Sequence, residues 1–137
     1  KELDKKGIKD KVKFISDLTS RQIAELYAES TIAVSPSVYE GFGFPAGEAM
    51  SCGIPLISTN GGSLPEVVGE SGIIVPHSNP DELQKAIKEL LLSPEKRREF
   101  GEKGRNRVLE KFTWRRAARE LVDVYREAIS NADNRSR

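Results

Sequence analysis

Short apolar runs alternate with helix signals along the first two thirds of the chain. The runs occupy residues 12–15, 31–35, 55–58 and 72–75, and each precedes residues that favour the start of a helix. Strands that alternate with helices form βαβ units, which place the strands in a parallel sheet with helices on its faces. The sequence therefore predicts an α/β fold with three layers, in which a parallel sheet is flanked by helices and further helices follow at the C-terminus.

Capping residues predict where the helices begin. Thr19 and Gln22 have the spacing of a capping box, whereas Asn79 and Ser93 each stand directly before a proline. Helices are expected to begin at Thr19, near Pro45 and at Ser63, and to span residues 81–92, 95–111 and 113–130. Residues 131–137 are expected to form a polar tail.

The formal net charge is +1, but it is unevenly distributed: +1 over residues 1–29, −5 over residues 30–92 and +5 over residues 93–137. A total near zero argues against a nucleic acid partner. No apolar run approaches the roughly 20 residues of a membrane span. The single cysteine and the lack of a leader-like segment favour the cytoplasm. The basic end leaves open a peripheral position at the inner membrane face.

The turn after the second predicted strand carries the richest chemistry. Ligands of parallel α/β sheets bind beyond the carboxyl ends of the strands. Gly41 and Gly43 would let backbone N–H groups approach a ligand, and a helix N-terminus near Pro45 would favour an anion. Glu48, placed in the first helical turn, could accept hydrogen bonds from a vicinal diol such as a ribose. Glu40 could accept from another hydroxyl or stabilise positive charge at a reacting carbon.

Simpler explanations compete with these roles. An acidic residue in the first turn of a helix also stabilises the helix itself, which explains Glu48 equally well. Two carboxylates could form a glycosidase acid/base pair, but such a pair must face each other across a cleft. Glu40 and Glu48 lie on one turn, which favours binding of hydroxyl groups.

The segment of residues 40–48, EGFGFPAGE, resembles the E-x7-E signature of the retaining nucleotide-sugar glycosyltransferases of family 4, the GT-B type with two facing Rossmann-like domains. Further segments follow the order of that family: Pro36-Ser37, Gly53-Ile54-Pro55, Gly61-Gly62, Pro65-Glu66 and Phe112-Thr113-Trp114. The resemblance covers residues 8–130.

This resemblance implies that residues 1–130 are a partial C-terminal, donor-binding Rossmann-like domain, truncated at its N-terminus. Glu48 would bind the ribose of a nucleotide-sugar donor, and Glu40 would be the catalytic carboxylate near the transferred sugar. The remaining donor-binding positions are expected at Gly41, Phe42, Gly43, Phe44 and, for the base, Leu18. No cofactor or metal is expected. The acceptor, a sugar, lipid or other glycoside, would be bound by a missing N-terminal domain.

Two features suggest an incomplete enzyme. No Lys or Arg occurs from Ser30 to Gln84, so the pocket is expected to lack a side-chain cation that would offset a diphosphate. The apolar stripe of the last helix would lack a partner, which favours self-association. We therefore expect a glycosyltransferase fragment that is inactive alone. The alternatives are a related sugar phosphorylase and a non-catalytic nucleotide-binding or interaction module.

Overall fold

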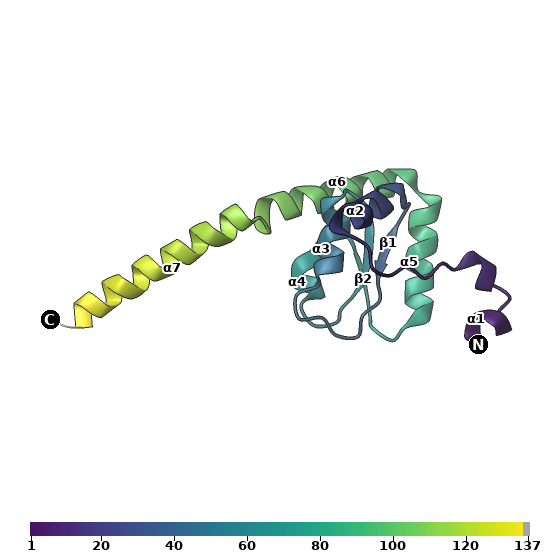
Figure 1. Ribbon diagram of the computed structural model, residues 1–137, viewed down its shortest axis with the longest axis horizontal. Helices are drawn as coiled ribbons and strands as arrows, with labels where there is room; N and C mark the ends of the chain where they lie inside the picture. Colours follow the sequence, from purple (N-terminus) through teal and green to yellow (C-terminus); the bar gives the residue numbers. More distant parts are fainter. Residues whose placement is uncertain (136–137) are drawn as a thin grey trace.

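The computed structural model describes the backbone of residues 1–135 and the side-chain burial of residues 1–132 (Figure 1). Three parallel strands form one sheet in the order β1-β2-β3, with bounds Ala33–Ser35, Leu56–Thr59 and Ile73–Val75. The register pairs Ser35 with Ser58, and Ser58 with Ile74. These strands lie within or one residue beyond three of the predicted apolar runs, and the predicted α/β fold with a parallel sheet is confirmed.

The helices are α1 (Glu2–Lys5), α2 (Ser20–Glu29), α3 (Phe44–Ser51), α4 (Leu64–Val68), α5 (Pro80–Leu92), α6 (Pro94–Lys111) and α7 (Trp114–Arg135), with a short 3₁₀ turn at Lys9–Lys11. Within residues 1–135, no helix is long and apolar enough to cross a membrane.

Side chains of β2 alternate between two hydrophobic clusters, one on each face of the sheet. Leu56 joins the cluster that contains Met50 of α3 and Leu64 of α4. Ile57 joins the opposite cluster, which contains Leu90 of α5. All four residues of β2 are buried, as expected for the central strand of a sheet that is covered on both faces. The domain therefore has three layers.

The predicted caps form where the sequence places them. Gln22 N donates to Thr19 Oγ1 at 3.4 Å, and the reciprocal bond completes the capping box of α2. The Asn79 side chain caps α5, and the Ser93 side chain caps α6. These local signals explain why the predicted helix starts lie within one residue of the observed ones.

The predicted strand at residues 12–15 is wrong. This segment has no regular secondary structure, and its apolar side chains are exposed, with Phe14 at 84%. A strand requires a hydrogen-bonded neighbour, and among the described residues the sheet ends at β1. Val34 of that edge strand is also 40% exposed.

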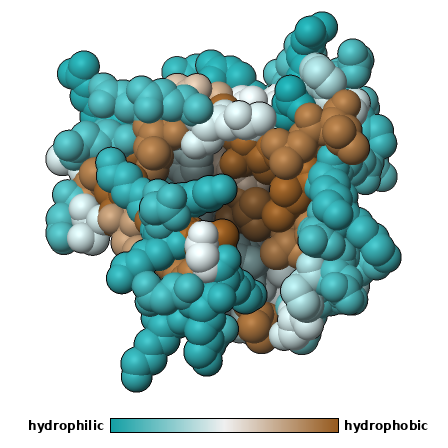
Figure 2. All heavy atoms as spheres, turned by 90° about the vertical axis from the view of Figure 1, so that its right-hand side faces the viewer, coloured by the Kyte–Doolittle hydropathy of each residue, from teal (hydrophilic) through white to brown (hydrophobic). Residues whose placement is uncertain are grey.

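Seen from the side that carries the N-terminal segment and α5, the molecule has a hollow with hydrophobic walls (Figure 2).

Helix α7 is longer than predicted and extends away from the rest of the domain (Figure 1). It continues through Arg135 rather than ending near Ser130, because no proline or glycine interrupts residues 131–135. Residues 136 and 137 of the predicted tail lie outside the described residues. On the apolar stripe of α7, Leu121 and Tyr125 are 51% and 60% exposed.

Arg107 connects α6 to the end of α4. Its Nε donates to the carbonyl of Val67 at 2.8 Å, and its Nη2 donates to the carbonyl of Glu66 at 2.6 Å. A guanidinium group suits this position because the last carbonyls of a helix lack partners within the helix. The short helix α4 is thereby fixed beside the central strand.

Candidate functional site

Helix α3 begins one residue before Pro45, which is enough to place Glu48 beyond the first helical turn. Gly43 is the N-cap with a φ of 88°, a left-handed conformation that glycine adopts readily, and the helix starts at Phe44. Glu48 therefore lies in the second turn, and no acidic residue occupies the first. Stabilisation of the helix start thus no longer explains Glu48, because that effect is confined to the first turn.

The Glu40 loop, defined as residues 36–43, lies against the turn between β2 and α4. Because β1 and β2 are parallel neighbours, their carboxyl ends place these two segments side by side. Ser63 N donates to the Glu40 carbonyl at 3.1 Å, and Ser63 Oγ donates to the same oxygen at 3.2 Å. The buried Thr59 hydroxyl donates to the Ser37 carbonyl. The loop is therefore held through its backbone.

Gly62 permits this close approach. Its φ is 60°, and a Cβ atom at this position would overlap the Glu40 carbonyl oxygen. The sequence places Ser63 at the start of α4, which is confirmed, but no cap forms through its side chain. The hydroxyl of Ser63 bonds to Glu40 instead, a long-range contact that no local sequence signal indicated.

The Glu40 carboxylate is half-buried and fixed by a side chain of its own loop. Ser37 Oγ donates to Glu40 Oε1 at 2.7 Å. Among the described residues, no Lys or Arg forms an ion pair with Glu40. The carboxylate therefore keeps most of its acceptor capacity for a ligand.

Aromatic side chains join this loop and the start of α3 to the segment between α6 and α7. The rings of Phe42 and Phe44 lie 4.9 Å apart, and Phe42 meets Phe112 edge to face at 5.9 Å. These aromatic residues, together with Glu48 and Trp114, line a groove of about 460 Å³. The sequence had indicated the aromatic turn at residues 112–114 only by its resemblance, without showing that it meets the Glu40 loop.

The groove contains a cation that the sequence did not lead us to expect. Lys111, from the end of α6, lines the groove together with Glu48. The absence of Lys and Arg from residues 30–84 therefore does not leave this groove without a positive side chain. Glu40 does not line the groove, so the predicted lack of a cation beside Glu40 stays a prediction. The contact arises because α6 packs on α3 from a distant part of the sequence.

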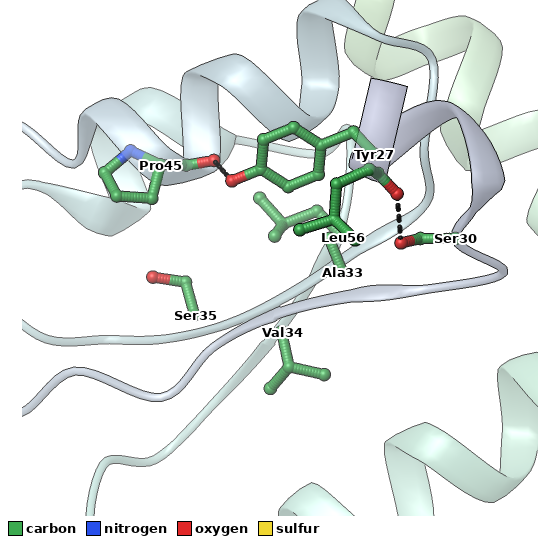
Figure 3. A pocket seen from close by; sticks show the side chains of 8 residues that line it. Tyr27, Ser30, Ala33, Val34, Ser35, Pro45 and Leu56 are labelled. Atoms are coloured by element: carbon green, nitrogen blue, oxygen red, sulfur yellow. Dashed lines mark hydrogen bonds between the residues drawn. The ribbon is translucent and has the colours of Figure 1, made fainter. Parts of the chain in front are cut away.

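Tyr27 of α2 supports the start of α3. Its hydroxyl donates to the Pro45 carbonyl at 3.2 Å, and its ring lies over Ala33 and Leu56 at a small hollow of about 120 Å³ (Figure 3). Burial, followed by the negative charge of Glu48, raises the pKa of Tyr27 above its usual value of 10.0.

The other predicted donor residues lie in two different segments of the chain. The Glu40 loop contains Gly41, Phe42 and Gly43, and Phe44 is the first residue of α3. Leu18 is half-buried in a separate turn, where the neighbouring hydrogen bonds are local, such as the one from Ser16 Oγ to Asp17 at 2.8 Å. In the described part of the chain, no group of three His, Cys, Asp or Glu side chains could hold a metal ion.

Comparisons with known proteins agree with this fold. The family described as Glycosyl transferases group 1 matches residues 1–107. The MMP alpha-(1->4)-mannosyltransferase of Mycolicibacterium hassiacum is 42% identical over 127 residues, which are 90% of this chain and 31% of that protein. The sucrose-phosphate synthase of Thermosynechococcus elongatus has a TM-score of 0.85 at 32% identity, over 95% of this chain and 33% of that one.

A third structure, Anabaena Alr3699/HepE in complex with UDP-glucose, has a TM-score of 0.83 at 20% identity and covers 92% of this chain and 35% of that one. At this identity the likeness shows the fold alone. The chain spans about a third of the length of the relatives it matches. The match over most of its length, together with the identity to the mannosyltransferase, shows that the chain belongs to the glycosyl transferases group 1 family.

Proposed function

We propose that this chain is the donor-binding part of a retaining glycosyltransferase of the E-x7-E type, and that it holds a nucleoside diphosphate sugar. The observation that carries the proposal is the placement of Glu40 and Glu48. One carboxylate is fixed in a loop at the carboxyl end of the parallel sheet, and the other lies on the helix that follows, where the helix dipole does not explain it.

In this proposal, the two carboxylates bind different parts of the donor. Glu48 accepts hydrogen bonds from the ribose hydroxyls, whereas Glu40 contacts the transferred sugar close to the reacting carbon. Backbone N–H groups from Gly41 to Phe44 face the sugar and the diphosphate. Lys111 adds a positive charge to the wall of the groove that contains Glu48.

The full reaction transfers the sugar to an acceptor with retention of configuration, and needs acceptor contacts outside the donor site. The chain has the length of about a third of its relatives, and we propose that it does not catalyse transfer alone. A transfer assay with the isolated chain and radiolabelled donors should detect no product. Measurable transfer would contradict this part of the proposal.

Calorimetric titration with UDP, GDP and ADP and with their glucose and mannose conjugates tests the donor site. Glu48→Gln should weaken the nucleoside diphosphate and its sugar conjugate alike, by about tenfold for a lost charge-assisted hydrogen bond. Glu40→Gln should weaken only the sugar conjugate. Glu70→Gln, at a position beyond α4, is the control. Equal affinities for all variants would contradict the proposed roles.

A further inference from the structure

Among the described residues, Ser37 is the side chain that forms a hydrogen bond with the Glu40 carboxylate, and it is itself firmly placed. Its carbonyl accepts a hydrogen bond from the Thr59 hydroxyl, which is buried at the end of the central strand. Ser37 is half-buried, and its Oγ lies 2.7 Å from Glu40 Oε1. A continuous set of contacts thus connects β2 to the carboxylate.

This contact is separate from the bonds that hold the backbone of the Glu40 loop. Thr59 and Ser63 bind carbonyl groups of the loop, and they do so whatever the orientation of the Glu40 side chain. The Ser37 hydroxyl, by contrast, binds the Glu40 side chain. Removing this hydroxyl would therefore release the carboxylate into several staggered rotamers while the loop keeps its backbone attachments.

We propose that Ser37 is a positioning residue, which orients the Glu40 carboxylate so that Oε2 stays available to the sugar of the donor. This inference rests on the proposed function. It adds a second residue to sugar recognition, acting through Glu40 rather than by contact with the donor. In this arrangement Oε1 accepts the hydrogen bond from Ser37, and Oε2 accepts a hydrogen bond from the sugar.

The first measurement needs no ligand. Three-bond couplings between Hα and the Hβ protons of Glu40 report whether its side chain holds one rotamer. We expect a single rotamer in the natural chain and in Ser37→Thr, which keeps a hydroxyl, and averaging in Ser37→Ala. Ser63→Ala, which removes a hydroxyl bound to the Glu40 backbone, should keep the single rotamer. Unchanged couplings in Ser37→Ala would overturn the inference.

The second measurement compares a nucleoside diphosphate with its glucose conjugate by calorimetry. Ser37→Ala should weaken the sugar conjugate by about fivefold, the effect of one hydrogen bond, and leave the diphosphate unchanged. Ser37→Thr should restore the affinity for the conjugate. Equal weakening of both ligands would indicate a general structural role and overturn the inference.

The two measurements separate failure of the inference from failure of the proposed function. If the natural chain binds neither ligand, the proposed function fails and the role of Ser37 toward a sugar fails with it. The couplings of Glu40 then still decide whether Ser37 fixes the carboxylate. If both ligands bind and Glu40→Gln affects the conjugate while Ser37→Ala does not, only the role of Ser37 is overturned.

Discussion

Substitution of Gly62 by alanine probes the contact between the two loops of the site. A Cβ atom at residue 62 would overlap the Glu40 carbonyl oxygen and would lie 2.9 Å from the Glu40 nitrogen. Both neighbours are backbone atoms, so no side chain can rotate away. The Glu40 loop would have to move, and the two hydrogen bonds from Ser63 to the Glu40 carbonyl would be lost.

The expected cost has two parts. A left-handed conformation costs a non-glycine residue about 1–2 kcal/mol. The two lost hydrogen bonds contribute about 0.5–1.5 kcal/mol each. Gly62→Ala should therefore reduce the free energy of unfolding by about 2–5 kcal/mol, a large fraction of the about 5–15 kcal/mol that is typical of a domain.

Urea denaturation followed by circular dichroism measures this difference. Gly53 has a φ of 75°, but a methyl group added there would have no neighbour closer than 3.9 Å, so Gly53→Ala should show the conformational cost alone. Gly47 lies within α3 with open space around it, so Gly47→Ala should stabilise the fold by about 1 kcal/mol. If Gly62→Ala costs no more than Gly53→Ala, the contact with Glu40 does not hold the loop.

Further substitutions test the surrounding fold. Arg107→Ala removes two hydrogen bonds to the end of α4 and should cost about 2–4 kcal/mol in urea denaturation, and an unchanged midpoint would contradict this. Leu90→Ala in the core should cost about 3–5 kcal/mol, whereas Leu92→Ala, 85% exposed, should change stability by less than about 0.5 kcal/mol. Because the pKa of Tyr27 is raised, the folded chain keeps a proton that the unfolded chain releases above pH 10.0, so stability should fall as the pH rises through the raised pKa. Tyr27→Phe should remove this dependence, seen by comparing urea midpoints at about pH 8 and about pH 11, and a parallel fall in both proteins would refute it.

Local signals predicted much of the fold. The capping box of α2 and the side-chain caps of α5 and α6 involve residues three apart, so their chemistry is visible in a short window of sequence. The central strand is an apolar run because helices cover both its faces. The segment at residues 12–15 has the same local pattern, but a strand also depends on a neighbour, which no local pattern reports.

The sequence singled out the candidate residues but did not indicate how they are arranged. The spacing of Glu40 and Glu48 drew attention to the loop and the helix. The helix starts at Phe44, however, and this places Glu48 in the second turn rather than the first. Contacts across long separations were missed, including the Ser63 hydroxyl at Glu40 and Lys111 in the groove. Such contacts are set by the packing of strands and helices, which local sequence does not specify.

Binding of a nucleotide sugar by the Glu40 loop and the start of α3 is the proposal on which the other proposals depend. Amide chemical shifts of the ¹⁵N-labelled chain, recorded during titration with UDP-glucose and GDP-mannose, test it most directly. We expect saturable shifts at Gly41, Gly43 and Phe44, with smaller shifts for the free diphosphates. Absence of shifts with every nucleotide sugar, or shifts confined to α5 and α7, would contradict it.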